Sequence, residues 1–143
     1  MREIKFRGKR IDNGEWVFGS LIQAPNDLYH KVFIVVDASV RYDTTYVGND
    51  DSVRVSSVMF AVDPKTVGQL TGLHDKNRRE IYDGDIIRYT VYDRTEVLSV
   101  FLNKGCFKTK ISNLFAVHAI CEVIGNIYPN PELLKGSDDN GKS

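Results

Sequence analysis

Three acidic side chains gather in the segment 80–87, where their spacing gives the first hint of chemistry. Asp83 and Asp85 flank Gly84, and Glu80 lies just before them. A divalent cation could use such carboxylates, but an EF-hand loop needs further oxygens and a distal glutamate that the sequence lacks. An Asp-Gly pair commonly marks a turn, in which glycine adopts a positive φ and aspartate accepts bonds from backbone amides. We therefore predict a turn here and no metal site.

The histidines, serines and glycines do not form a catalytic pattern. His30, His74 and His118 are scattered, without the spacing of metal ligands or of a catalytic triad. No serine lies in a Gly-x-Ser-x-Gly motif, and no glycine-rich stretch has the pattern of a phosphate-binding loop. His74 stands beside Asp75 in a polar loop, so it is a candidate for ligand contact; a solvated loop histidine is the alternative. We predict no enzyme activity, no catalytic residue and no cofactor.

A basic run precedes the acidic segment. Lys76, Arg78 and Arg79 form it, and Arg88 and Tyr89 follow on a predicted strand. Cationic and aromatic side chains together can bind phosphates and stack on bases. Against this, aromatic residues of small β domains usually fill the core, and the 19 basic side chains are balanced by 19 acidic ones, without the basic excess expected for nucleic-acid binding. The candidate contacts with a ligand or nucleic acid are His74, Lys76, Arg78, Arg79, Arg88 and Tyr89.

Composition indicates a globular protein. The 143 residues are 42% hydrophobic and 27% charged, which suits one domain or two very small ones with a buried core. Cys106 and Cys121 match no metal or redox spacing, so both are expected to be small buried hydrophobes in a reducing cytosol. The N-terminus lacks the apolar core of a signal peptide, and no run is long enough to cross a membrane. We expect a cytoplasmic protein with no membrane partner.

The first half of the sequence is typical of β-strands. Alternating charged and apolar residues over 3–11, the Asn13-Gly14 pair and the segment 16–22 predict an N-terminal β-hairpin. The apolar run 32–36 is unbroken, short and β-branched, which favours a strand over a helix. Strands are expected over 29–36, 53–55 and 58–62, with a loop over 42–51 and a boundary at Asp63-Pro64.

The second half also consists of short strand-forming segments separated by turns, as in a meander, a small barrel or a sandwich. The expected strands are 66–73, 81–82, 85–92, 95–102, 106–111 and 122–127, with a turn at 103–105 and with Tyr82 and Phe101 in the core. One helical turn is expected over 130–135, capped by Asn130 and started by Pro131. We predict a mainly β protein with a β-rich N-terminal subdomain over 1–63, a barrel-like domain over 64–135 and a disordered tail over 136–143.

Three segments in this order resemble the YopX family of phage and prophage proteins: 1–7 (MREIKFR), 68–87 (GQLTGLHDKN followed by EIYDGDII at 80–87) and 122–134 (EVIGNIYPNPELL). The resemblance implies an SH3-like barrel in the C-terminal part, a bacterial host and no established activity, so there are no catalytic residues to assign by analogy. Relatives tend to have a glycine after Asn77, where this chain has Arg78. We expect a different or longer turn at this point.

Together these features favour a non-enzymatic phage or prophage accessory protein that acts as an interaction module, by associating with itself as a homo-oligomer or by binding another protein. The basis is a neutral charge, several strands with free edges and no catalytic constellation. The alternative is a nucleic-acid-binding regulator of phage replication or expression that uses the basic run. A metal-dependent hydrolase built on Asp83 and Asp85 ranks last. The sequence identifies no particular protein partner.

Overall fold

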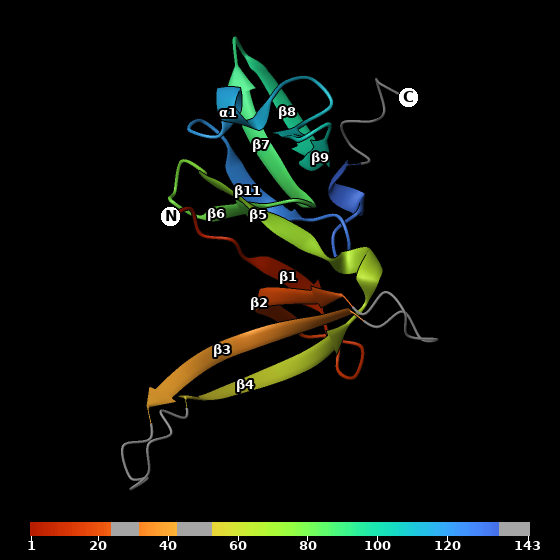
Figure 1. The fold of residues 1–143 in the computed structure, drawn as a ribbon. Helices are drawn as coiled ribbons and strands as arrows, with labels where there is room; N and C mark the ends of the chain where they lie inside the picture. The colour runs from red at the N-terminus through yellow and green to blue at the C-terminus, as the bar shows by residue number, and fades with distance from the viewer. Residues whose placement is uncertain (24–31, 43–52, 135–143) are drawn as a thin grey trace, which may run out of the picture. The chain divides into compact units, whose positions relative to one another are not determined.

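The computed structural model describes residues 1–23, 32–42 and 53–134, which form antiparallel β-sheets with two short helices (Figure 1). The chain divides into two compact units. The N-terminal unit is Lys5–Val67, and the C-terminal unit is Gly68–Ser143 together with Met1–Ile4. The sequence placed a boundary at Asp63-Pro64, a few residues before the division between the units.

The N-terminal unit is a four-stranded antiparallel meander. Its strands are β1 (Phe6–Lys9), β2 (Trp16–Gln23), β3 (Val32–Tyr42) and β4 (Val53–Val62), and they pair in the order β4-β3-β2-β1. The predicted hairpin at Asn13-Gly14 is confirmed: Gly14 has φ +74°, and β1 pairs with β2. Each strand has one face toward a core of Val17, Ile34 and Val62.

The two outer strands of this meander meet at one end. Arg10 forms an antiparallel bridge with Val62, and the backbone N–H of Asp63 donates to the carbonyl of Lys9 at 2.8 Å. A 3-10 helix, η1 (Pro64–Thr66), follows directly. Its Thr66 hydroxyl accepts from the Lys9 N–H at 2.9 Å and donates to the Asp63 carbonyl at 2.7 Å. The Thr66 side chain therefore holds the end of β1 against the exit of β4.

The C-terminal unit contains shorter strands around a second core. The hairpin of β5 (Gly68–His74) and β6 (Glu80–Tyr82) leads into β7 (Asp85–Val91), which pairs with β8 (Arg94–Ser99) and β11 (Glu122–Asn126). A second hairpin, β9 (Phe101–Asn103) with β10 (Cys106–Lys108), precedes α1 (Leu114–Val117). The core residues are Ile81, Ile87, Tyr89, Val100, Leu114, Val117, Cys121 and Val123. The described strands of this unit do not close into a barrel.

Several predictions of individual elements were wrong. The two strands expected over 53–55 and 58–62 are one continuous β4, and the strand expected over 95–102 is split by buried Val100 into β8 and β9. The helix α1 was not predicted. Cys106 is exposed at the start of the three-residue strand β10, and Phe101 is only partly buried.

The predicted helical turn after Asn130 is present in the described residues 130–134, where the N–H of Leu133 donates to the Asn130 carbonyl at 3.1 Å. The Leu133 side chain packs at Gly125, where an added Cβ would lie 2.7 Å from Leu133 Cδ1. Of the loop expected over 42–51, Tyr42 is instead the last residue of β3, and 43–51 lie outside the described residues. The same holds for the tail expected over 136–143 and for 29–31 of the predicted third strand.

Candidate functional sites

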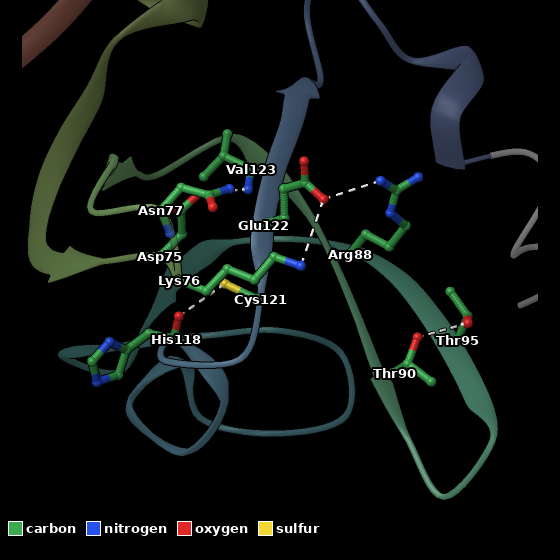
Figure 2. Close-up of polar contacts among 10 residues, drawn as sticks. All are labelled: Asp75, Lys76, Asn77, Arg88, Thr90, Thr95, His118, Cys121, Glu122 and Val123. Carbon is green, nitrogen blue, oxygen red and sulfur yellow. Dashed lines mark hydrogen bonds and ion pairs between the residues drawn. The ribbon is translucent and has the colours of Figure 1, made fainter.

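The turn between β5 and β6 is built around one buried carboxylate, that of Asp75. Its Oδ1 accepts from the backbone N–H groups of Asn77 at 2.8 Å and Arg79 at 2.9 Å. Its Oδ2 accepts from the N–H of Val123 in β11 at 3.0 Å. Burial raises the pKa of this carboxyl, but the three backbone bonds, from Val123 first, outweigh burial and leave the pKa below its ordinary value of 3.8. Asp75 therefore joins the turn to a strand that is distant in sequence (Figure 2).

Further bonds fasten the same turn to the segment between α1 and β11. The Lys76 N–H donates to the Cys121 carbonyl at 2.9 Å, and His118 Nδ1 lies 2.9 Å from the His74 carbonyl, which fixes the proton on Nδ1. The Cys121 thiol donates to the His118 carbonyl at 3.4 Å. Burial raises the pKa of this thiol to about 11. The Cys121 thiol is thus buried, bonded within its own unit and held in its protonated form at neutral pH.

Two of the candidate cations share one acceptor on the surface. Arg88 of β7 lies opposite Glu122 of β11, with Nη2 3.0 Å from Oε2, and Lys76 Nζ approaches the same oxygen at 4.0 Å (Figure 2). Both cationic side chains are half exposed. Their positive charge is therefore partly balanced by the carboxylate.

The structure brings together five of the six residues predicted to contact a ligand. His74, Lys76, Arg78, Arg79 and Arg88 are exposed, the first four in and beside the β5–β6 turn and Arg88 on β7 across from β11. Tyr89 is 7% exposed and belongs to the core. Side chains alternate along a strand, so when Arg88 faces solvent its neighbour must face inward. Tyr89 is not available as a base-stacking platform.

The backbone conformation of Arg78 is one that favours glycine. Its φ is +66°, in the left-handed region that glycine adopts readily and other residues adopt at a cost. The same conformation would suit the glycine of related sequences. The bonds from Asn77 and Arg79 to Asp75 hold the turn in this conformation with arginine present.

The acidic segment 80–87 contains the predicted turn at Asp83-Gly84, between β6 and β7, with Gly84 at φ +92°. The Asp85 carboxylate, which is 2% exposed, accepts a hydrogen bond from the Tyr82 N–H at 2.8 Å. Ile81, Ile86 and Ile87 are fully buried beside it. Among the described residues, no group of three His, Cys, Asp or Glu side chains could hold a metal ion.

A second site lies on the N-terminal sheet, on the face opposite its core. The register places Ile22, Phe33 and Ala61 in one row across β2, β3 and β4, and Ser20, Val35 and Met59 in the next row. Phe18 follows along β2 on the same face. We call Phe18, Ile22, Phe33, Val35, Met59 and Ala61, with Ser20 among them, the outer face.

The outer face is apolar although it is accessible to solvent. Phe18 is 45% exposed, Ile22 44% and Met59 51%, and Phe33, Val35 and Ala61 are partly buried. Sequence reasoning did not assign a site to this face. A signal was present, because the apolar run 32–36 does not alternate with polar residues as a strand with one solvated face normally does.

An antiparallel meander and a second unit of short antiparallel strands define a small, mainly β protein. The family described as YopX protein matches residues 5–135, and the chain belongs to the YopX family. In the crystal structure of protein EF1440 from Enterococcus faecalis, a chain 23% identical in sequence has a similar fold, with a TM-score of 0.65 over 94% of this chain and 99% of that one. None of the curated proteins compared with this chain matches it. Within the described residues, no helix is long and apolar enough to span a membrane.

Proposed function

We propose that this protein is a non-enzymatic interaction module that binds a protein through the outer face. The observation that carries the proposal is the exposure of Phe18, Ile22 and Met59 on neighbouring strands of one sheet. Contiguous exposed apolar patches on soluble proteins commonly mark interaction sites. As a member of the YopX family, the protein would act as a phage or prophage accessory protein in the bacterial cytoplasm.

The groups that could do chemistry support this proposal, because they are used to build the fold. The Asp75 and Asp85 carboxylates are buried and accept backbone N–H groups, and the Cys121 thiol is buried with a raised pKa. A nucleophile or general base needs a group that can reach a substrate. An SH3-like arrangement of the strands in the C-terminal unit is part of the same proposal, supported by its two hairpins and three-stranded sheet around one core.

A photo-crosslinking experiment tests the module. The substitution Phe18→p-benzoylphenylalanine places a crosslinker on the outer face, and Tyr92→p-benzoylphenylalanine is the matched control, since Tyr92 is an aromatic residue 96% exposed in the other unit. After irradiation in cells that encode the protein, we expect discrete protein adducts from position 18 that mass spectrometry identifies. Equal adducts from both positions, or none from position 18, would overturn the proposal.

The nucleic-acid alternative rests on the exposed cations around the β5–β6 turn. Arg78 and Arg79 are exposed there, and Lys76 and Arg88 form ion pairs with Glu122. If these cations contact phosphates, Glu122→Gln should strengthen binding, because it removes the carboxylate that competes for two of them. Filter binding of DNA and RNA at low salt, with wild type, Glu122→Gln and the control Glu132→Gln, tests this. No retention of either nucleic acid would remove the alternative.

A further inference from the structure

We infer that a cavity in the C-terminal unit binds a small, neutral aromatic compound that carries a carbonyl oxygen. The cavity has a volume of about 310 Å³, and residues of that unit alone line it. It is separate from the outer face, so the inference goes beyond the proposed function. Ligand sites on proteins are commonly apolar cavities of this size or larger, with a few polar groups that orient the ligand.

The end of the β7–β8 hairpin forms one part of the cavity lining. Tyr89 pairs with Glu96 across the two strands, and Val91 pairs with Arg94. Because side chains alternate along a strand and paired residues share a face, these four side chains lie on the same face of the hairpin. All four line the cavity. The hairpin therefore presents one rigid, mostly apolar face to a ligand.

The segment between β10 and the end of α1 supplies the rest of the lining, through Ile111, Ser112 and Val117. Ser112 is held in place by Thr109, which is fully buried. The Ser112 N–H donates to the Thr109 hydroxyl at 3.1 Å, and the Ser112 carbonyl accepts from the Thr109 N–H at 2.8 Å. These bonds fix the backbone of Ser112 and leave its hydroxyl unused.

Two hydroxyls of the lining have no hydrogen-bond partner in the part of the chain that the structure describes. Ser112 Oγ is buried and unpaired. Tyr89 is only 7% exposed, and its hydroxyl bonds to no other described residue. Buried polar groups in native proteins are nearly always paired, so an unpaired one points to a partner that binds from outside. A carbonyl oxygen has two lone pairs and can accept a hydrogen bond from each hydroxyl.

The charges and the volume of the cavity restrict its ligand further. Arg94 Nη2 lies 3.7 Å from Glu96 Oε1, so the two charged groups of the lining balance each other and do not favour a charged ligand. An apolar cavity of about 150 Å³ can hold a benzene ring. The larger volume here suits one ring with a short polar substituent.

Tyr92 adds an exposed aromatic ring at the mouth of the cavity. It is 96% exposed, and its φ of +50° lies in the left-handed region. Asp93 follows with φ +64°, so the two residues form a hairpin turn in which asparagine and glycine are usual. Residues other than glycine that are held in this conformation cluster at functional sites. The Tyr92 ring can stack on an aromatic ligand.

Titrations of the full chain followed by ¹H–¹⁵N NMR test the inference. The probe is acetophenone, an aromatic ring with a carbonyl group. Two matched compounds each lack one feature: ethylbenzene lacks the oxygen, and 1-cyclohexylethanone lacks the aromatic ring. Acetophenone should shift the amide signals of the lining residues, with a dissociation constant on the order of 1 mM. It should bind at least about threefold more tightly than either matched compound.

Two conservative variants test the role of the hydroxyls. Ser112→Ala and Tyr89→Phe each remove one unpaired hydroxyl and should weaken acetophenone binding about threefold or more, with ethylbenzene binding unchanged. Tyr128→Phe is the matched control, because Tyr128 belongs to the same unit but does not line the cavity. It should bind both compounds as the wild type does. Neither lining hydroxyl bonds to a described residue, so both variants should remain folded, which thermal melting checks.

Three results would overturn the inference. The first is the absence of saturable shifts up to about 10 mM acetophenone, or shifts centred on residues away from the cavity. The second is equal binding of acetophenone and either matched compound. The third is unchanged acetophenone binding in both hydroxyl variants, because recognition would then not use these groups. Crosslinking from position 18 reports on the outer face and is independent of all three, so the proposed function and this inference can fail separately.

Discussion

The β5–β6 turn and the outer face differ in how their side chains are used: those of the turn have hydrogen-bond partners within the protein, and those of the outer face remain partly exposed to solvent. Around the turn, polar and titratable side chains dominate, and those of Asp75, His118 and Cys121 each have a partner within the same unit. On the outer face, the side chains are apolar, and three of them are about half exposed. The residues with catalytic potential thus stabilise the fold, whereas the apolar residues of the outer face stay partly exposed to solvent. Four predictions can break or sharpen this comparison.

Removing the Asp75 carboxylate should have the largest effect. Asp75→Ala leaves three backbone N–H groups without an acceptor, two in the turn and one in β11. Because unpaired buried donors are costly, the free energy of unfolding should fall by about 3 kcal/mol in urea titrations. The control Glu132→Ala, at an exposed position, should change it by less than about 0.5 kcal/mol. A similar small loss for both variants would mean that the turn does not depend on Asp75.

Acid should remove part of the same stabilisation. The pKa of Asp75 is lower in the folded protein than its ordinary value of 3.8. The stability from this difference is therefore fully present above the unfolded pKa and is lost as the pH falls through the folded pKa. Between about pH 5 and pH 2, the free energy of unfolding of the wild type should fall more steeply than that of Asp75→Asn. Parallel pH profiles of the wild type and Asp75→Asn would show that the pKa of Asp75 is the same in the folded and the unfolded protein.

Relief of backbone strain at Arg78 should have an effect of the opposite sign. Arg78→Gly removes the penalty of a left-handed φ but adds freedom to the unfolded chain, so we expect a net gain of about 0.5–1 kcal/mol. The neighbouring Arg79→Gly is the control. Arg79 is exposed too, but its φ is not positive, so glycine should destabilise the protein there. Denaturant midpoints of the two variants should move in opposite directions.

A charge on the outer face should have the smallest effect on the stability of a single chain. The Met59 side chain is 51% exposed, so Met59→Glu loses little buried area. Its free energy of unfolding in urea titrations should change by about 0.5 kcal/mol or less. A loss above about 2 kcal/mol would instead place Met59 in a packed core, and the contrast between the two regions would disappear.

Local signals in the sequence predicted the turns and most strands. Asn13-Gly14 and Asp83-Gly84 specify positive φ at known positions, and β-branched runs specify strands. These features depend on a few neighbouring residues. Whether the strands of the C-terminal unit close into a barrel depends on pairings between distant segments, which no local pattern records.

The features that the sequence missed depend on partners far along the chain. Asp75 drew notice only as the neighbour of His74, because its bond partner Val123 is 48 residues away. The helix α1 has only four residues, and its cap residue Asn113 makes no side-chain capping bond. It is held by tertiary burial of Leu114, not by local propensity. Tyr89 was a candidate base-stacking residue together with the cations, but side chains alternate along a strand, and the exposed position of Arg88 turns Tyr89 toward the core.

The contact between the end of β1 and the exit of β4 in the N-terminal meander can form only late in the synthesis of this unit. The hydrogen bond from Lys9 to Thr66 joins residues 57 positions apart. Because the chain is made from its N-terminus, this bond can form only after the rest of the meander and η1 have been synthesised. At about 5–20 residues per second, that delay lasts several seconds. During this interval the outer edge of β1 near Lys9 has no partner from β4, so chaperone contact and premature pairing between nascent chains are most expected there.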